Sequence, residues 1–456
     1  SVLNSRLSQG ERYDQFKRAR RGEIQIMVGP RSALFTPFSK LGLIIIDEEH
    51  EQTYKSESSP RYHARETAVQ RACMEGAKVV LGSATPSLEA YTKAVSGEFA
   101  LVKMNARFED RPLPGVSIID LREELKAGNR SVLSRKLTEA IGERLKAGEQ
   151  TMLFLNRRGY AGFVSCRSCG EVLKCPHCDV ALSEHNNGKM ICHYCGYQRP
   201  KADICPSCGS PYIGGFKAGT QQIEQVLKKT FPEARILRMD YDTTRTKGSY
   251  EEILASFAAH EADILVGTQM IVKGHDFPEV TLVGAVAADL SLNMADYRCG
   301  ERTFQLLTQA VGRSGRGRKA GEAFIQTYHP EHYSIQAAAA QDYQRFYQEE
   351  MSYRMLLDYP PAAHMLSILA SGQDDELLEK GMEFLRKFAE RISPGKELHI
   401  IGPAWASVGK VNDVYRKVLY MKHAEEKVLM DMKDKIGKYI EINSGFRKLY
   451  IMFDYQ

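Results

Sequence analysis

The sequence predicts an α/β protein that carries a cysteine-rich insertion and ends in a smaller α+β domain. Short apolar runs alternate with helix-like runs through the first 330 residues. Eight cysteines lie in four C-x-x-C pairs between Cys166 and Cys208. A Tyr-Pro-Pro break at Tyr359 then begins a tail in which strands and helices follow a different order.

Eight apolar runs are candidate strands of the α/β portion. They are short and mostly do not alternate with polar residues, which is typical of parallel strands buried on both faces. The candidates cover residues 24–28, 43–46, 78–81, 152–155, 235–239, 263–266, 281–287 and 323–327. Helical patterns lie between them, as at 134–147, where Ser134 is a candidate N-cap and apolar residues recur from Leu137 to Leu145. Repeated strand–helix units predict α/β layers.

Proline, glycine and charged residues concentrate at 105–131, which predicts a linker between two such layers. The predicted domains are residues 1–120, which include the first part of this linker, and residues 121–358. The cysteine-rich segment, 166–212, interrupts the second domain and is expected on a loop at the edge of its sheet.

The tail, residues 359–456, reads β-α-β-β-α-β, which predicts a ferredoxin-like domain. In its first helical run Leu378, Met382 and Leu385 share one face. Four basic side chains of the tail are expected on a solvated face: Lys410, Arg416, Lys417 and Lys422.

Composition sets broad limits on class. The chain has 456 residues and a formal net charge of +5, which permits nucleic-acid binding without requiring it. Apolar stretches stay well short of about 18 residues, so we expect no membrane span, and we see no secretory signal. Clustered C-x-x-C pairs indicate metal in a reducing compartment, so we expect a cytoplasmic protein. Cys73 and Cys299 stand apart and are expected to be ordinary residues.

Acidic residues follow the apolar run at 43–46 directly, in the order D-E-E-H. The carboxyl end of a strand is where α/β sheets bind ligands. In a site that hydrolyses phosphate esters, one acid holds Mg²⁺ and a second orients or deprotonates water. We therefore predict that Asp47 binds Mg²⁺ and that Glu48 activates water; a solvated loop is the alternative. The chain contains no G-x-x-x-x-G-K-[ST] phosphate loop.

Polar residues also follow other candidate strands. In L-G-S-A-T-P, Ser83 and Thr85 can hydrogen-bond the acidic motif and couple it to a moving lobe. After the run at 152–155, Asn156 and Arg157 suit a nucleic-acid backbone. A plain polar turn or loop is the alternative in each case.

The segment V-G-T-Q-M-I-V-K-G-H-D-F-P-E-V follows a later strand candidate. Gly274 allows close backbone approach. Thr268 and Gln269 can bond phosphate, and Asp276 can bond a ribose hydroxyl. An ordinary polar loop is again the alternative.

The segment Q-L-L-T-Q-A-V-G-R-S-G-R-G-R carries the sharpest pattern. Gln309 and Arg313 lie four residues apart, on one helical face. Arg316 follows just beyond Gly315. Two arginines at a helix end resemble the arginine fingers that stabilise charge on a transferred phosphoryl group. The alternative is an exposed basic helix end.

The cysteine pairs predict two structural zinc ions. Each C-x-x-C presents two thiolates, and two such knuckles complete a tetrahedral Cys₄ site. Three pairings exist; the 13 residues between Cys178 and Cys192 contain Asn-Gly, a hairpin signal, and this favours a nested arrangement. The predicted groups are Cys175, Cys178, Cys192 and Cys195, and Cys166, Cys169, Cys205 and Cys208. Nearby histidines, expected in solvent, are His177, His185 and His193.

These motifs stand in the order of superfamily 2 helicases. With V-G-P-R-S-A-L-F-T-P-F, S-P-R-Y-H-A-R-E and the cysteine insertion, the sequence resembles the PriA family of bacterial primosomal replication-restart helicases, from about Gly22 onward. The resemblance implies two RecA-like helicase lobes, the first incomplete, with an inserted double zinc ribbon and the C-terminal ferredoxin-like domain. The nested cysteine pairing agrees with the family.

The resemblance also implies a function: an ATP-dependent 3′→5′ DNA helicase that recognises stalled forks and D-loops and initiates primosome assembly. ATP with Mg²⁺ would be bound between the lobes by Asp47, Glu48, Glu49, His50, Gly274, Asp276, Gln309, Arg313 and Arg316. Arg31 and Ser32 would join Asn156, Arg157, Thr268 and Gln269 in contacting DNA. Implied partners are forked and single-stranded DNA, single-stranded-DNA-binding protein and helicase-loading proteins. We expect a monomer at the nucleoid.

The sequence departs from the family pattern at several points. The phosphate loop and the N-terminal DNA-binding region are absent, so we expect them upstream of Ser1 and expect this chain alone to be inactive. Pro60 stands where some members carry Trp, and Gln221 where some carry an acid. Two alternative functions remain at this point. One is a non-hydrolytic DNA-binding module whose zinc ribbons dock partner proteins; the other is a related motor acting on RNA or recombination DNA.

Overall fold

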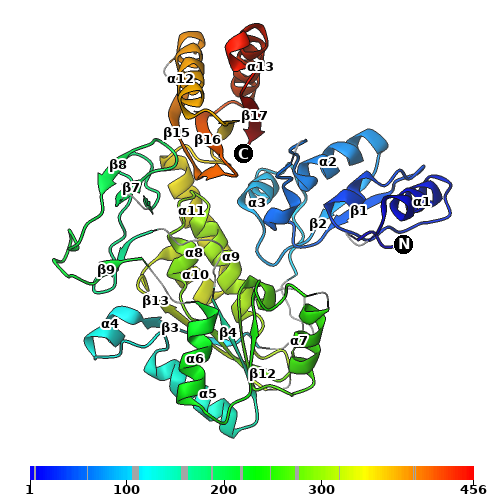
Figure 1. Cartoon of the computed structure of the whole chain (residues 1–456). Coiled ribbons are helices and arrows are strands. Elements are labelled where there is room, and N and C mark those ends of the chain that lie inside the picture. Colours follow the sequence, from blue (N-terminus) through cyan, green and yellow to red (C-terminus); the bar gives the residue numbers. More distant parts are fainter. Residues whose placement is uncertain are drawn as a thin grey trace. The chain divides into compact units, whose positions relative to one another are not determined.

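The computed structural model of the chain divides into two compact units, Ser1–Leu101 and Val102–Gln456 (Figure 1). The structure describes residues 1–4, 7–58, 60–104, 112–155, 163–185, 188–215, 219–246, 248–272, 277–317, 319–393, 395 and 397–456. Among these residues, no helix is both long enough and apolar enough to span a lipid bilayer.

The first unit is built on two parallel strands, β1 and β2, with helix α2 packed against both. Its elements are α1 (Gln9–Arg20), η1 (Arg31–Phe35), β1 (Leu43–Ile46), η2 (Gln52–Tyr54), α2 (Ala64–Glu75), β2 (Lys78–Leu81) and α3 (Leu88–Val95). Ile46 is buried, whereas Ile45 is 66% exposed and Val80 is 49% exposed. The prediction that both faces of these strands are buried is therefore wrong for one face. The strand predicted at 24–28 is also wrong, because only Val28 forms a bridge there.

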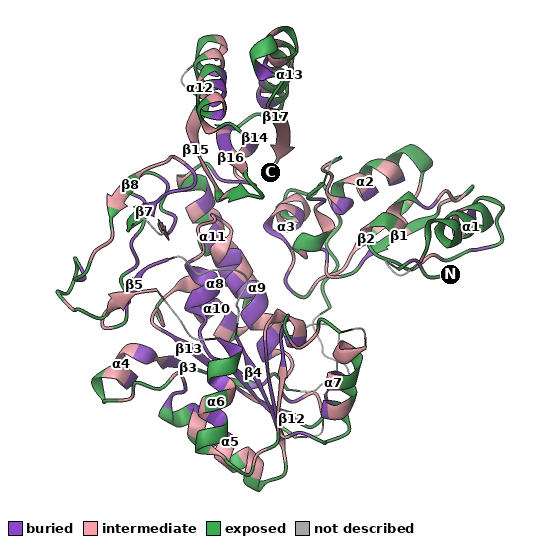
Figure 2. Cartoon of the chain, viewed as in Figure 1, coloured by how far each residue is buried: buried purple, intermediate pink, exposed green. Residues whose placement is uncertain are grey.

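The second unit contains a six-stranded parallel sheet in the order β10-β11-β4-β12-β13-β3. Its strands are β3 (Gly115–Asp120), β4 (Gln150–Phe154), β10 (Ile236–Met239), β11 (Ile264–Gly267), β12 (Val280–Ala285) and β13 (Glu322–Thr327). The central strands β4, β11 and β12 are buried throughout, and Figure 2 shows this for β4 and β12. This burial explains their continuous apolar sequences.

Helices pack against this sheet and the helices beside it. They are α5 (Arg135–Lys146), α6 (Thr220–Thr230), α7 (Ser249–Ala258), α8 (Asp289–Leu292), α9 (Cys299–Val311), α10 (Tyr333–Ala340) and α11 (Tyr343–Leu356). A short helix, α4 (Leu121–Lys126), directly follows β3. Ser134 caps α5 as predicted, since its hydroxyl accepts the N–H of Leu137 at 3.2 Å. The linker predicted at 105–131 is wrong in its described part, which forms β3 and α4. The three predicted domain ranges stay predictions.

The cysteine-rich segment forms small antiparallel ribbons. Strand β5 (Ser165–Cys166) pairs with β9 (Ile213–Gly214). Strands β6 (Ser183–Glu184), β7 (Lys189–Ile191) and β8 (Gln198–Pro200) form a second sheet.

The C-terminal domain has the predicted β-α-β-β-α-β order. Its elements are β14 (His364–Gly372), α12 (Asp375–Ile392), β15 (His399–Val411), β16 (Val414–His423), α13 (Glu426–Ile442), η5 (Ser444–Phe446) and β17 (Tyr450–Tyr455). The antiparallel sheet runs β15-β16-β14-β17, so the first and third strands of the domain lie side by side at its centre. Leu378, Met382 and Leu385 of α12 are fully buried in its core. The ferredoxin-like prediction is confirmed.

Candidate active site and candidate metal centres

The acidic motif lies at the carboxyl end of β1. Oδ1 of Asp47 accepts a hydrogen bond from the main-chain N–H of Glu48 at 3.0 Å. Glu48 has a left-handed backbone conformation with φ of 47°, which is uncommon for a residue other than glycine. Its Oε2 atom is buried and accepts no hydrogen bond from the described residues; Nδ1 of His50 lies 3.6 Å away. One carboxylate oxygen of Glu48 thus has no hydrogen bond from the described residues.

The segment after β2 contacts this motif through Ser83. Its Oγ lies 2.6 Å from Nδ1 of His50 and accepts the N–H of Thr85 at 3.0 Å. The hydroxyl of Thr85 is buried and has no hydrogen-bond partner among the described residues. Of the two residues predicted to couple the motif to its surroundings, Ser83 makes the contact.

Glu49, the third residue of the motif, points into the protein. It is 1% exposed, and both of its carboxylate oxygens accept hydrogen bonds from Ser87 or Arg65. Protein donors thus occupy both carboxylate oxygens of Glu49 in this structure, and its predicted contact with nucleotide stays a prediction. The sequence did not identify Arg65 as the partner of Glu49, because the two residues lie 16 positions apart and the burial of Glu49 is visible only in the structure.

Arg31 is held by the loop that follows the acidic motif. Its Nη1 lies 2.8 Å from the main-chain oxygens of both Thr53 and Lys55. The hydroxyl of Tyr54, between them, donates to the main-chain oxygen of Asp47 at 2.8 Å. Burial raises the pKa of Tyr54, and the charge of Asp47 adds to this. Ser32 is exposed beside Arg31, and contact of both residues with DNA stays a prediction.

In the second unit the predicted arginines follow α9. Gln309 lies in the last turn of the helix. Nε of Arg313 donates to the main-chain oxygen of Val272 at 2.6 Å, and Nε of Arg316 donates to that of Gly312 at 2.9 Å. Both guanidinium groups are thus anchored on their own unit.

The backbone conformation at Gly315, which lies between these two arginines, requires a glycine. Its φ is +67°, and a Cβ atom there would lie 2.4 Å from the main-chain nitrogen of Gly321. Any larger residue would push the segment away from β13 and its preceding turn. The backbone that follows α9 therefore requires a glycine at this position.

The remaining predicted residues of the second unit are only partly described. Asn156, Arg157, Gly274 and Asp276 lie outside the described residues. Thr268 follows β11 and donates its N–H to the main-chain oxygen of Met239 at 3.3 Å. Gln269 begins the short helix η4 (Gln269–Val272).

The eight clustered cysteines form two groups. One contains Cys175, Cys178, Cys192 and Cys195, and the other contains Cys166, Cys169, Cys205 and Cys208. All four sulfur atoms of each group lie within 4.8 Å of one another. The predicted nested arrangement is confirmed.

The sulfur spacing fits a tetrahedral metal site. Sγ atoms are 3.7 Å apart in Cys166–Cys208 and in Cys169–Cys205, and 3.5 Å apart in Cys175–Cys195. A zinc ion with Zn–S bonds of about 2.3 Å needs sulfurs roughly 3.8 Å apart. The donor set therefore suits zinc, with no position left for a water ligand.

Each C-x-x-C is followed by a residue in the left-handed conformation, a regularity that the sequence analysis missed. These residues are Gly170, Asp179, Gly196 and Gly209, with φ of 86°, 50°, 79° and 69°. Each donates its N–H back to the first cysteine of its pair at 2.8–3.0 Å. The pattern C-x-x-C-[GD] was the available signal. The left-handed residue after each pair gives the four turns the same backbone geometry.

His193 is buried, contrary to the expectation that it lies in solvent. Its Nδ1 lies 3.0 Å from the main-chain oxygen of Trp405, and burial lowers its pKa. It contacts the C-terminal domain and is not in either cysteine group.

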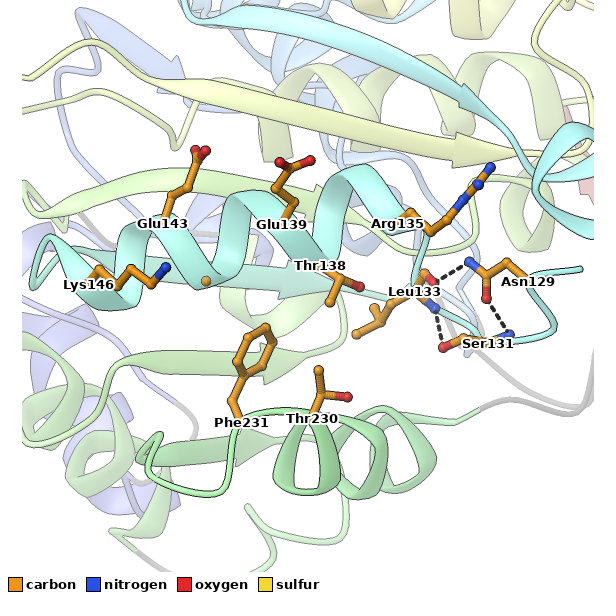
Figure 3. A pocket seen from close by; sticks show the side chains of 11 residues that line it. Asn129, Ser131, Leu133, Arg135, Thr138, Glu139, Glu143, Lys146, Thr230 and Phe231 are labelled. Carbon is orange, nitrogen blue, oxygen red and sulfur yellow. Dashed lines mark hydrogen bonds between the residues drawn. The ribbon is translucent and has the colours of Figure 1, made fainter. Parts of the chain in front are cut away.

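A groove of about 690 Å³ runs along α5 and the end of α6 (Figure 3). Thr138, Gly142 and Phe231 lie along it, and Arg135 and Glu143 bring opposite charges. None of the predicted site residues is among the described residues that line it. The groove therefore shares no described residue with the candidate active site.

Three family models match the chain. The PriA DNA helicase Cys-rich region (CRR) domain matches residues 175–200, and the Helicase conserved C-terminal domain matches residues 215–318. The Primosomal protein N C-terminal domain matches residues 355–454. The matches follow the cysteine insertion, the second sheet and the C-terminal domain of the structure.

Curated relatives carry the name Replication restart protein PriA. The Bacillus subtilis protein is 46% identical over 437 residues, which cover 96% of this chain and 54% of the relative. The Borreliella burgdorferi protein is 35% identical over 450 residues, which cover 96% of this chain and 67% of the relative. Among solved structures, Mycobacterium smegmatis helicase Lhr bound to ssDNA and AMP-PNP has a TM-score of 0.40 at 14% identity, covering 77% of this chain and 37% of that chain. A likeness at that level carries no argument.

The chain spans about half the length of the Bacillus subtilis relative. Identity runs over almost the whole chain, and the cysteine-rich and C-terminal models belong to the same kind of protein. The chain belongs to the PriA family of replication restart proteins.

Proposed function

We propose that this chain is the motor and zinc-binding portion of an ATP-dependent 3′→5′ DNA helicase that acts at stalled forks and D-loops and initiates primosome assembly. One observation carries the proposal: Asp47 and Glu48 stand at the carboxyl end of β1, and Oε2 of Glu48 accepts no hydrogen bond from the described residues. Family membership supports the helicase class.

In this proposal Asp47 holds Mg²⁺ and Glu48 takes the proton of the attacking water. Arg313 and Arg316 stabilise charge on the transferred phosphoryl group. His50 and Ser83 couple the site to the segment after β2, because their side chains are in contact. The sequence has no G-x-x-x-x-G-K-[ST] run, and the proposal places the phosphate loop in a longer PriA protein that contains this sequence. The chain alone is then inactive as an ATPase.

Zinc is the proposed occupant of both cysteine groups. Four thiolates complete the coordination of each ion, so zinc would supply structural rigidity and no reactive water. The eight cysteines hold the ions, and the left-handed residues after each pair set the turns. Removing zinc is expected to disorder these ribbons first.

Forked and single-stranded DNA are the proposed nucleic-acid partners. Arg31, Ser32, Thr268 and Gln269, with Asn156 and Arg157, are proposed contacts to the DNA backbone. Single-stranded-DNA-binding protein and helicase-loading proteins are the proposed protein partners.

ATP hydrolysis in the presence of DNA tests the proposal. We expect a full-length PriA protein carrying this sequence to hydrolyse ATP faster with forked DNA, and residues 1–456 alone to stay at background. A full-length protein that binds forks without DNA-stimulated hydrolysis would instead be a binding and recruiting module. Equal stimulation by an RNA fork would contradict the assignment to DNA.

A further inference from the structure

The third residue of the acidic motif, Glu49, forms a buried ion pair with Arg65. Glu49 and Arg65 are 1% and 6% exposed, and Ser87 beside them is 5% exposed. Arg65 lies in the first turn of α2, and Ser87 is the N-cap of α3. Three segments of the first unit therefore meet at one carboxylate. Charged groups are buried only where partners compensate them.

Both carboxylate oxygens of Glu49 accept hydrogen bonds from described residues. Oε1 accepts the N–H of Ser87 at 2.6 Å, and Oε2 accepts the hydroxyl of Ser87 at 2.9 Å. Oε2 also accepts Nη1 of Arg65 at 2.8 Å, and Nη1 contacts the hydroxyl of Ser87 as well. The pKa of Arg65 is raised: burial opposes its charge, but Glu89 and Glu49 outweigh that effect. Among the partners that the structure gives to Glu49, only Arg65 carries a full charge.

This pair borders the strained residue of the motif. Glu48 has φ of 47°, and such conformations persist where the surroundings hold them. Before it, the main-chain oxygen of Asp47 accepts a hydrogen bond from the hydroxyl of Tyr54 at 2.8 Å. After it, the N–H of Glu49 donates to the main-chain oxygen of Gly82 at 3.0 Å, and the Glu49 carboxylate is clamped. Both neighbours of Glu48 are thus anchored, and the direction of its side chain follows from them.

We propose that Arg65 is a positioning residue for hydrolysis. By holding the carboxylate of Glu49, it keeps Glu48 in the left-handed turn from which its carboxylate reaches the attacking water. Arg65 itself touches neither nucleotide nor water in this account. The inference rests on the proposed function, in which Glu48 is the general base.

A double-mutant cycle tests whether Arg65 acts through Glu48. Full-length proteins with Glu48→Gln, Arg65→Met, and both changes are compared with wild type for kcat, KM, binding of a fluorescent ATP analogue and Tm. We expect Glu48→Gln to lower kcat about 10²-fold or more, and Arg65→Met to lower it about 10-fold with KM nearly unchanged. The double variant should be no slower than Glu48→Gln, because the base that Arg65 positions is already absent.

Controls separate positioning from general stability. Arg71→Met removes another largely buried arginine of α2, which bonds the main-chain oxygens of Leu34 and Thr36 and does not contact Glu49. It should lower Tm without changing kcat by more than about 2-fold. Arg65→Lys keeps the charge beside Glu49 and should recover part of kcat; it carries the same cycle if Arg65→Met does not fold.

Two results would contradict the inference, for different reasons. If Arg65→Met slows hydrolysis by the same factor in the wild-type protein and in the Glu48→Gln variant, Arg65 does not act through Glu48 and the inference is wrong. If Glu48→Gln alone leaves kcat unchanged, the proposed general base is wrong, and the inference that depends on it is wrong too. The single Glu48 variant thus distinguishes the two failures.

Discussion

The hydroxyl of Tyr359 donates a hydrogen bond to the main-chain oxygen of Cys178, 3.2 Å away. The Tyr359 ring stacks on that of Tyr297, with centroids 4.6 Å apart and planes 1° apart. The ammonium of Lys422 lies 3.4 Å from the Tyr359 centroid. One buried side chain thus joins the inner cysteine group, the segment before α9 and the C-terminal sheet.

Substitution of Tyr359 should show how much this junction stabilises the fold. Tyr359→Phe leaves the oxygen of Cys178 without its donor and should lower the free energy of unfolding by about 1–2 kcal/mol. Tyr359→Ala also removes a ring that is 1% exposed, and should cost about 3–5 kcal/mol. Urea unfolding measures both, with Tyr450→Phe, 58% exposed, as the control. Equal effects of Tyr359→Phe and Tyr450→Phe would mean that the hydrogen bond contributes nothing.

The two cysteine groups should differ when metal is lost. The inner group lies in a core shared with Tyr359 and Met365 of the C-terminal domain. Tyr194, between its cysteines, stacks on Tyr420 of β16 at 4.9 Å. In the outer group Cys208 is exposed. Loss of the inner zinc should therefore free the C-terminal domain, and loss of the outer zinc should act locally.

Cysteine variants test this difference. Cys178→Ser and Cys208→Ser should each lower the zinc content from two ions to one by elemental analysis. Only Cys178→Ser should speed amide hydrogen exchange in β16 and release a C-terminal fragment on limited proteolysis. Equal release by both variants would contradict a specific role for the inner group. A wild-type content of one zinc would contradict the two-site account.

His332 should make stability depend on pH. Burial lowers its pKa to about 4, with His329 and Lys174 acting the same way and Asp289 opposing them. Its Nδ1 accepts the N–H of Ser334 at 3.2 Å, which needs the neutral ring. The unfolded chain binds a proton near its ordinary pKa of about 6.5, so stability falls as pH drops from about 6.5 to 4.

His332→Asn isolates this effect, because asparagine can cap α10 without titrating. Relative to wild type, the variant should gain about 2–3 kcal/mol of unfolding free energy between pH 7.5 and pH 4.5. Chemical denaturation at both pH values measures the difference. Parallel pH profiles for the two proteins would show that His332 keeps an ordinary pKa in the folded state.

The strands of the second sheet could be predicted because burial on both faces makes their sequences continuously apolar. Strand β3 could not, since Gly115–Asp120 alternates in burial at the sheet edge and follows a proline-rich segment. The open face of β1, with Ile45 in solvent, could not be predicted either, because its apolar sequence is that of a covered strand. An apolar strand sequence shows that a face of the strand suits apolar neighbours. It does not show whether those neighbours are present.

Side-chain burial of charged residues was the least predictable part. Lys417 and Lys422 were expected in solvent, yet they are 6% and 5% exposed. Lys417 lies 4.4 Å from the ring centroid of Trp405, and burial lowers the pKa of Lys422 to about 8. Glu49 is a similar case. Nothing local in the sequence distinguishes a carboxylate that meets an arginine across the fold from one that faces solvent.

The catalytic assignment of Glu48 is the central claim, and one measurement tests it most directly. Single-turnover ATP hydrolysis by a full-length PriA protein is measured on forked DNA for wild type, Glu48→Gln and the control Glu98→Gln, whose exposed carboxylate pairs with Lys93. Glu48→Gln should lower the rate about 10²–10⁴-fold while fork affinity stays within about 2-fold, and Glu98→Gln should match wild type. A Glu48→Gln rate within a few-fold of wild type would contradict the account.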